Sequence, residues 1–379
     1  MKKIKILIVI GTRPEAIKLA PLIVHLRKES WAEVRVLATA QHRELLDQVL
    51  TIFSINPDID LNIMEHNQSL SLLTSKLLDK FDSILSSENP DIVLAQGDTT
   101  SAMVAALSCF YKKIPFGHLE AGLRTYDIHN PFPEEFNRQL IGKISKWHFA
   151  PTELAMNNLV NENISKQDIL VTGNTGIDAL LMASAMLEGK ELKKEHGKRL
   201  LLVTAHRREN FGMPIQNICE ALKIIASQHK DIKILFPVHP NPNIRQKVHQ
   251  ILNGCENIIL SSPLGYREFI EALNKAYFVI TDSGGIQEEA PSIGKPVLIL
   301  RNETERPEAL EFSISKLVGT EKNKIIHCVN KLLLDNNYYK KIARPVNCYG
   351  DGKASERIIN FISNKFLLTD HKICHYTKN

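Results

Sequence analysis

The chain alternates short apolar runs with longer amphipathic segments, and this alternation limits the folds open to it. Apolar runs of this length predict buried strands, and the amphipathic segments predict helices. Strands that alternate with helices form parallel sheets covered by helices on both faces. We therefore predict an α/β protein with two Rossmann-like, doubly wound domains that face a cleft. The predicted strands are Lys5–Ile10, Val34–Ala38, Asp91–Gln96, Pro115–Leu119, Trp147–Ala150 and Asp168–Thr172 in the first half, and Arg199–Thr204, Ile232–Val238, Asn257–Ser261, Phe278–Thr281, Pro296–Leu300 and Lys316–Val318 in the second.

The length of 379 residues exceeds what one hydrophobic core usually supports. A charged stretch rich in Lys and Glu separates the two series of strands, and we place the connection between domains at Asn174–Lys198. The predicted domains are residues 1–175 and 176–354. The segment from Ser355 to Phe366 is predicted to be a helix, and the residues after it, from His371 to Asn379, are predicted to be frayed.

Composition excludes several classes of function. The net charge is +5, but Lys and Arg are spread evenly and no basic run is interleaved with aromatic residues, which argues against nucleic-acid binding. The six cysteines are far apart and have no metal-ligand spacing, so we expect no metal site and a reducing, cytoplasmic location. No apolar run is long enough to span a membrane, so we expect no membrane association.

Polar clusters follow most of the predicted strands directly. Open α/β sheets bind ligands beyond the carboxyl ends of their strands, so two such sheets predict one shared cleft. In the first half these clusters contain Arg13, Asp98 and Glu120, and in the second half His206, His239, Ser283 and Arg306.

Two of these clusters are suited to bind phosphate. Ser283, Gly284 and Gly285 lie where a strand turns into a helix, and amide groups at a helix start attract anions. Arg13 and Lys18 lie on the first turns of another predicted helix, where two cations would clamp a diphosphate. The alternatives are a plain strand–turn–helix connection and a solvated helix start.

Three carboxylates and two histidines are candidates for acid–base chemistry. Asp98 and Glu120 follow strands, and Glu134 follows a rigid Pro-Phe-Pro loop. A partly buried carboxylate has a raised pKa and can exchange protons near neutral pH. Each carboxylate alone is as well explained by a cap or a salt bridge. His206 and His239 could bind a phosphate or act as acids, and a structural role remains the alternative for His239.

At these residues the sequence resembles the bacterial non-hydrolysing UDP-N-acetylglucosamine 2-epimerase family. The resemblance implies a GT-B-like fold, a C-terminal helix (residues 355–379) that packs back on the first domain, and interconversion of UDP-GlcNAc and UDP-ManNAc. It also implies a homodimer and no metal or nicotinamide cofactor, and the chain contains no G-x-G-x-x-G motif. The stretches that carry it are GTRPEAIKLAP, QHRELLDQVL, QGDTTSAM, GHLEAGLRT, PFPEEFNRQ, TGNTGIDAL, AHRRENFG, PVHPNPN, TDSGGIQEEAPSIGKPV, TERPEAL and YGDGKASERI.

The resemblance assigns roles to individual residues. Its catalytic candidates are Asp98, Glu120, Glu134 and His206. The residues expected to contact the substrate are Arg13, Lys18, Asp98, Glu120, His206, Leu264, Phe269, Ser283, Gly284, Gly285, Glu289 and Arg306, of which Leu264 and Phe269 would lie against the uracil. UDP-GlcNAc would also activate the enzyme at a second spot, which Gln41, His42, Glu134 and Arg207 match. Asn67 stands where some family members have a basic residue.

The chemistry of the implied substrate favours elimination. The C2 hydrogen of the sugar is not acidic, so without a nicotinamide to oxidise the sugar, UDP must leave first and give 2-acetamidoglucal. The resulting ManNAc units would serve surface polysaccharide synthesis. Three alternatives stay open: a hydrolysing epimerase that releases free ManNAc, a GT-B glycosyltransferase that uses an acceptor, and a catalytically inactive nucleotide-sugar sensor.

Overall fold

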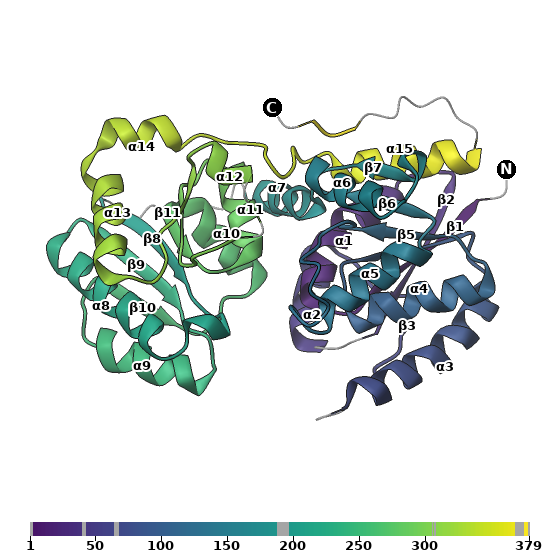
Figure 1. Ribbon diagram of the computed structural model, residues 1–379, viewed down its shortest axis with the longest axis horizontal. Helices are drawn as coiled ribbons and strands as arrows, with labels where there is room; N and C mark the ends of the chain where they lie inside the picture. The colour runs from purple at the N-terminus through teal and green to yellow at the C-terminus, as the bar shows by residue number, and fades with distance from the viewer. Residues whose placement is uncertain are drawn as a thin grey trace. The chain divides into compact units, whose positions relative to one another are not determined.

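The computed structural model describes residues 3–39, 43–63, 68–187, 197–304, 306, 308–367 and 375–377. The chain forms two compact units, each built around its own parallel sheet (Figure 1). Unit 1 comprises Met1–Met182 and Gly350–Lys378, and unit 2 comprises Ala183–Tyr349. The first boundary between the units therefore lies inside helix α7, after Met182, whereas the prediction placed it at residue 175. The second boundary lies after Tyr349, whereas the prediction placed it at residue 354. The segment that we predicted as a connection is helical over Thr175–Leu187 because its apolar residues pack into a core.

Unit 1 contains a sheet of seven parallel strands in the order β3-β2-β1-β4-β5-β6-β7. Its central strand β4 is buried on both faces, as expected for a sheet covered by helices on both sides. Chain order reverses between β1 and β4, where Ile8 pairs with Leu94. The strands are β1 (Ile4–Ile10), β2 (Ala32–Ala38), β3 (Ile59–Asp60), β4 (Ile92–Gln96), β5 (Phe116–Leu119), β6 (Trp147–Ala150) and β7 (Ile169–Val171). The prediction missed β3, because two residues are too short to form an apolar run.

The helices of unit 1 are α1 (Arg13–Leu26), α2 (Arg43–Ile52), α3 (Leu70–Glu88), α4 (Thr100–Lys112), α5 (Glu134–Ile144), α6 (Glu153–Asn161), α7 (Thr175–Leu187) and α15 (Ala354–Leu367). The last helix packs on the unit in which the chain begins, since the ring of Phe361 lies edge-on to Trp147 and α15 contacts α1. Asp178 of α7 caps α15 by accepting hydrogen bonds from the amides of Ala354 and Ser355. The helix ends at Leu367, so the prediction of a helix over residues 355–379 was too long.

The tail beyond α15 is ordered where the structure describes it, so the prediction that it frays was wrong for these residues. The amide of Tyr376 donates to the carbonyl of Val171 over 2.8 Å, and the side chain of Tyr376 is buried. The guanidinium of Arg357 lies over its ring. The tail thus covers part of β7, which is the edge strand of the sheet, and blocks its exposed backbone groups.

Unit 2 contains a sheet of six parallel strands in the order β10-β9-β8-β11-β12-β13, which reverses between β8 and β11. Phe236 and Phe278 are fully buried in its core. The strands are β8 (Arg199–Thr204), β9 (Ile232–Pro237), β10 (Ile258–Ser261), β11 (Ala276–Thr281), β12 (Val297–Ile299) and β13 (Ser315–Leu317). The helices are α8 (Met213–Gln228), α9 (Pro242–Leu252), α10 (Tyr266–Lys275), α11 (Gly284–Ser292), α12 (Glu308–Glu311), α13 (Lys322–Leu334) and α14 (Asn336–Ile342).

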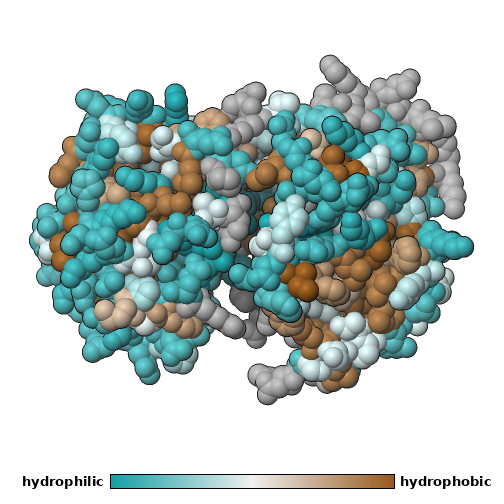
Figure 2. Space-filling model, in the orientation of Figure 1, coloured by the Kyte–Doolittle hydropathy of each residue, from teal (hydrophilic) through white to brown (hydrophobic). Residues whose placement is uncertain are grey.

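Both sheets confirm the predicted α/β class with two Rossmann-like domains. Figure 2 shows apolar residues gathered on the visible face of unit 1. Within the described part of the chain, no helix is both long enough and apolar enough to cross a membrane.

Candidate active site

The residues singled out from the sequence lie at the reversal points of the two sheets. In unit 1 the loops after β1 and β4 carry Arg13 and Asp98, and in unit 2 the loops after β8 and β11 carry His206 and Ser283. Reversal points are where open α/β sheets form crevices, because the connections on either side diverge to opposite faces.

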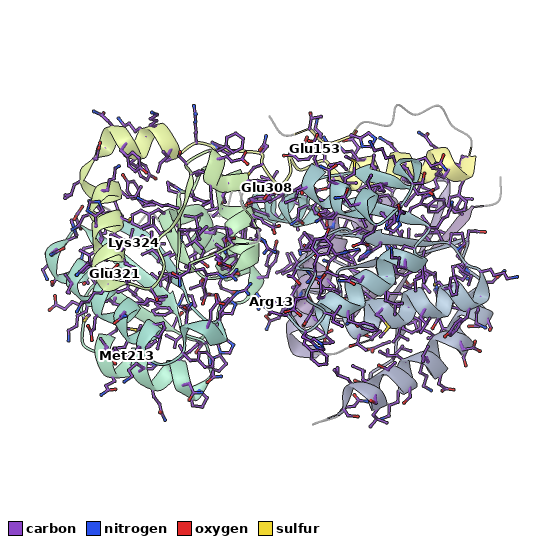
Figure 3. The ribbon with its side chains drawn as sticks, in the orientation of Figure 1. Arg13, Glu153, Met213, Glu308, Glu321 and Lys324 are labelled. Atoms are coloured by element: carbon purple, nitrogen blue, oxygen red, sulfur yellow. The ribbon has the colours of Figure 1, made fainter. Side chains whose placement is uncertain are left out.

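Glu15 fastens the first of these loops. Its Oε2 accepts from the amide of Gly11 over 2.8 Å, and its Oε1 accepts from the hydroxyl of Thr99 over 2.6 Å. Burial raises the pKa of Glu15, although its hydrogen bonds to Thr99, Thr12 and Gly11 oppose this shift. From the sequence we interpreted the start of α1 only as a pair of cations and did not assign a role to Glu15. The Thr-x-x-Glu spacing of a capping box was a usable signal for that role. Because Glu15 uses these amides, an anion at this helix start would meet side chains such as Arg13 (Figure 3).

Lys18 and Glu120 form an ion pair in unit 1. The other carboxylate oxygen of Glu120 accepts a hydrogen bond from the side-chain amide of Gln96 at the end of β4. Lys18 is therefore the partner of a catalytic candidate, which the sequence did not predict. Glu120 also has a φ of +62°, a left-handed conformation that costs a residue with a Cβ about 1–2 kcal/mol. Strain of this kind concentrates at functional sites, where the surrounding structure holds it in place.

We predict that Glu120→Gly is more stable than Glu120→Ala by about 1 kcal/mol, because both remove the carboxylate but only glycine relieves the left-handed strain. Chemical denaturation of the two variants measures this difference. Both variants lack a carboxylate that the sequence resemblance gives as a catalytic candidate, so both should lose the activity that the resemblance implies. Equal stabilities would mean that Glu120 is not strained.

Asp98 is held by the first turns of α5. Its carboxylate lies 2.6 Å from Arg138, and its carbonyl accepts from the amide of Asn137 over 2.8 Å. Burial raises the pKa of Asp98, the Arg138 charge opposes this, and the neighbouring carboxylates Glu120 and Glu134 raise the pKa further. These contributions show that the three predicted carboxylates are neighbours in unit 1. The prediction missed Arg138, although it lies four residues after Glu134 and therefore on the same face of α5.

Glu135 fixes the loop that precedes α5. This fully buried carboxylate accepts from the amides of Thr125 and Tyr126 over 3.0 and 3.1 Å, and it also pairs with Arg138. The hydrogen bonds hold the pKa of Glu135 low despite the burial that opposes ionisation. The sequence predicted a rigid loop here from its prolines. The structure adds that a buried charge anchors the loop.

The start of α11 in unit 2 has the features of an anion site. Gly284 and Gly285 begin the helix, and a Cβ on Gly284 would lie 2.8 Å from the guanidinium carbon of Arg306. The guanidinium thus lies against the helix start, where the helix dipole also favours negative charge. Glu288 orients Arg306 by accepting a hydrogen bond from its Nε. The structure therefore brings the predicted residues Ser283, Gly284 and Arg306 together.

We predict that Gly284→Ala raises KM for a UDP-sugar about 10-fold or more while the melting temperature changes little. The added methyl displaces the flexible end of Arg306 rather than backbone, so binding suffers more than folding. Gly285→Ala is the matched control, because its Cβ would meet nothing within 4 Å. A similar KM for both variants would contradict this role of Arg306.

His206 and His239 lie together in unit 2. Their rings stack with centroids 6.1 Å apart, and Nδ1 of His206 lies 3.1 Å from Oδ1 of Asp282. Partial burial and the charge of His206 lower the pKa of His239, while Asp282 opposes this. Arg207 donates from its Nε to the carbonyl of Asp282 over 3.1 Å. The sequence analysis assigned no role to Asp282, although its place at a strand end was a usable signal.

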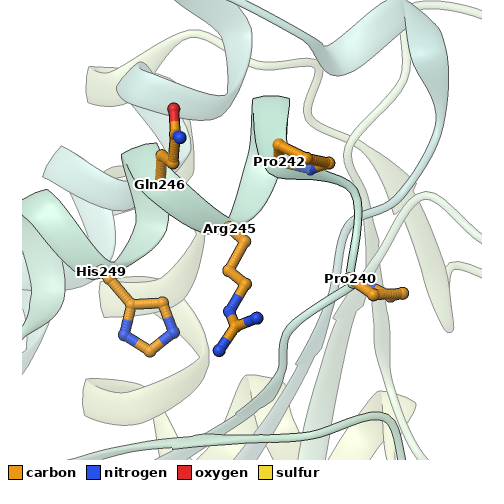
Figure 4. Close-up of a pocket in the computed structure, with 5 residues that line it drawn as sticks. All are labelled: Pro240, Pro242, Arg245, Gln246 and His249. Carbon is orange, nitrogen blue, oxygen red and sulfur yellow. The ribbon is translucent and has the colours of Figure 1, made fainter.

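A cavity of about 470 Å³ lies beside His239 and is lined by Pro240, Pro242, Arg245, Gln246 and His249 (Figure 4). Two basic side chains of α9 thus border a concave surface that the sequence did not predict.

The remaining predicted residues fall elsewhere. Leu264 and Phe269 are half-buried at the start of α10, and Glu289 is half-buried on α11. Gln41, His42 and Asn67 lie outside the described residues. Among the residues that the structure describes, no group of three or more His, Cys, Asp or Glu side chains could hold a metal ion.

Known proteins resemble this chain over nearly its whole length. The family model "UDP-N-acetylglucosamine 2-epimerase" matches residues 24–363. The UDP-N-acetylglucosamine 2-epimerase of Campylobacter jejuni is 51% identical over 371 residues, which cover 94% of this chain and 97% of that protein. The crystal structure of UDP-GlcNAc 2-epimerase from Neisseria meningitidis bound to UDP-GlcNAc has a TM-score of 0.88 and 45% identity, and the match covers 95% of this chain and 99% of that one.

A more distant structure bears on the fold alone. The glycotransferase of kitacinnamycin has a TM-score of 0.61 at 10% identity over 95% of this chain and all of that one. The chain thus has the two-domain fold of GT-B glycosyltransferases. Its sequence matches, however, are to epimerases, and the chain belongs to the UDP-N-acetylglucosamine 2-epimerase family.

Proposed function

We propose that this protein interconverts UDP-GlcNAc and UDP-ManNAc by inverting C2 of the sugar. The observation that carries the proposal is the match at 51% identity over nearly the full length of a UDP-N-acetylglucosamine 2-epimerase. The arrangement of charged residues within each unit supports it, because one unit is suited to bind a diphosphate and the other to move protons.

We assign the nucleotide to unit 2. The amides at the start of α11 and the guanidinium of Arg306 would bind the diphosphate, and Glu289 would also contact the substrate. Leu264 and Phe269 would lie against the uracil. Bond breaking at C1 adds a negative charge to the departing UDP, and oriented amides and cations are the strongest stabilisers of such charge. Arg13 and His206 would add to this stabilisation.

We assign the proton transfers to unit 1. In the proposed reaction one carboxylate removes the proton from C2 as the C1–O bond to UDP breaks, giving UDP and 2-acetamidoglucal. A proton then adds to C2 from the opposite face, and UDP adds back to C1. Two acid–base groups are required, and Asp98, Glu120 and Glu134 supply them. The raised pKa of Asp98 suits a group that must hold a proton in part of the cycle.

NMR of UDP-GlcNAc with purified protein in deuterated water tests the proposal. We expect UDP-ManNAc to appear without any acceptor and deuterium to enter at C2. Accumulation of UDP in step with free ManNAc would instead identify a hydrolysing epimerase. Turnover only with an added acceptor would identify a glycosyltransferase, and no turnover under any condition would identify a sensor.

We propose further that UDP-GlcNAc activates the enzyme at a second spot formed by Gln41, His42, Glu134 and Arg207. The contact of Arg207 with the Asp282 carbonyl supports this, because it joins such a spot to the loop of His206. The reverse reaction, started with UDP-ManNAc alone, should then show a lag that a trace of UDP-GlcNAc removes. Reaction without a lag would contradict activation.

We also propose that the protein is a homodimer and that its product supplies ManNAc for surface polysaccharides. Unit 1 exposes large apolar side chains on neighbouring helices, Leu70 and Leu72 on α3 and Phe110 and Tyr111 on α4. Lys112 pairs with Asp82, so Phe110 and Tyr111 lie beside the end of α3, away from Leu70 and Leu72 at its start, and each pair is a small apolar surface that a partner could cover. Sedimentation analysis of the wild type and of Phe110→Glu tests the dimer, and a wild-type monomer would refute it.

A further inference from the structure

Asp282 joins the two strand-end loops of unit 2. It lies directly after β11, and its side chain is fully buried. Its Oδ2 accepts three hydrogen bonds of 2.8 Å each, from the amides of His206 and Arg207 after β8 and from the side-chain amide of Asn210. One carboxylate oxygen therefore fixes the backbone that carries His206.

The other carboxylate oxygen faces the imidazole of His206. Oδ1 is buried, accepts no hydrogen bond of good geometry from the described residues, and lies 3.1 Å from Nδ1 of His206, whose side chain is 44% exposed. A small rotation of the imidazole would therefore give this oxygen a donor. Burial opposes ionisation of Asp282, but His206 and the amides of Arg207 and His206 outweigh it and lower the pKa of Asp282. An ionised carboxylate only accepts hydrogen bonds. The proton of a neutral His206 therefore belongs on Nδ1, which leaves the lone pair on Nε2.

We propose that Asp282 is a positioning residue that holds His206 in the Nδ1–H tautomer and so presents Nε2 to the UDP-sugar. The proposal rests on the proposed epimerase function for its catalytic consequence. When neutral, Nε2 accepts a proton, and after protonation it donates one to an oxygen of the departing diphosphate. A carboxylate that fixes the tautomer of a histidine through Nδ1 acts in this way in serine proteases.

His239 provides an internal contrast. Its Nδ1 lies 3.2 Å from the backbone amide of Asn241 and accepts a hydrogen bond from it. A ring nitrogen that accepts from an amide carries no proton, so neutral His239 has its proton on Nε2. The two stacked histidines are therefore expected in opposite tautomers.

NMR of the full-length protein with 15N-labelled histidine tests the tautomers directly. Spectra are recorded near pH 8.5, about two units above the usual pKa of a histidine side chain, in order to observe neutral imidazoles. We expect an Nδ1–H pattern for His206 and an Nε2–H pattern for His239, with His206→Asn and His239→Asn samples to assign the signals. An Nε2–H pattern for His206 in the wild type would overturn the proposal, whether or not the protein epimerises UDP-GlcNAc.

Asp282→Asn tests the catalytic consequence. The asparagine oxygen can still accept the hydrogen bonds from the amides of His206 and Arg207 and from the side chain of Asn210. Its NH2 group would then donate to Nδ1 and force His206 into the Nε2–H tautomer. We expect kcat to fall about 10- to 1,000-fold, with a smaller change in KM. The NMR pattern of His206 should change in parallel.

Two comparisons separate positioning from general damage. In a His206→Asn background, adding Asp282→Asn should lower kcat by less than about 3-fold, because both changes remove the same group from action. An undiminished fall in that background would overturn the proposal. Asp231→Asn is the matched control. Asp231 pairs with Arg199 at the opposite, amino end of the sheet, so kcat should stay near wild type.

Discussion

Replacing Asp98 with asparagine should lower the rate of epimerisation by about 100- to 10,000-fold, the range that one general acid or base contributes. The amide has the same shape but neither takes nor gives a proton at C2. Burial raises the pKa of Asp98, and Glu120 and Glu134 raise it further, so this carboxyl can hold a proton nearer to neutral pH than an exposed aspartate. Because Asp98 belongs to unit 1, UDP binding to unit 2 should change little.

The measurement is kcat by NMR of UDP-GlcNAc, together with calorimetry of UDP binding. Asp91→Asn is the matched control. Asp91 stands at the amino end of β4, and Asp98 lies just beyond its carboxyl end. Its Oδ2 accepts from the amide of Lys5 over 2.8 Å, which an asparagine oxygen can also do. If Asp98→Asn kept kcat within about 3-fold of Asp91→Asn, Asp98 would not be an acid–base group.

Gly122→Ala should destabilise unit 1 by about 3–5 kcal/mol, the range that marks severe substitutions. Gly122 follows β5 with a φ of +91°, and a Cβ there would lie 2.1 Å from the carbonyl oxygen of Ala155. That oxygen belongs to the backbone of α6 and cannot rotate away. The carbonyl of Gly122 also accepts from Asn158 of the same helix over 2.9 Å, so the contact is fixed from both sides.

The free energy of unfolding of unit 1, from a denaturant titration fitted with one transition for each unit, measures this effect. Gly254→Ala isolates the part due to backbone conformation. Gly254 has a φ of +81°, but its Cβ would meet nothing within 4 Å, so we expect a loss of only about 1 kcal/mol. If Gly122→Ala lowered the free energy of unfolding by no more than Gly254→Ala, α6 would be able to move away from the added methyl group. If the added methyl group shifts the loop, it should also displace Glu120, which lies two residues earlier.

The sequence determined the elements and their order. Nearly every predicted strand matches within a few residues, for example Trp147–Ala150 and Arg199–Thr204, because hydrophobic periodicity is a local property of the chain. It also identified which residues follow the strands, because the carboxyl end of a strand can be read from the chain. It could not find elements without a pattern, such as β3, or the boundary between the units inside α7.

Only the tertiary structure decided which charged groups pair. The sequence did not predict that Lys18 pairs with Glu120 or that Arg138 lies against Asp98. Asp282 appeared in the sequence as a turn residue and proves to hold His206. The physical reason is that an ion pair or a pKa shift depends on distance and burial between residues far apart in the chain. Periodicity records which face of an element is buried, but not which side chain from another element it meets.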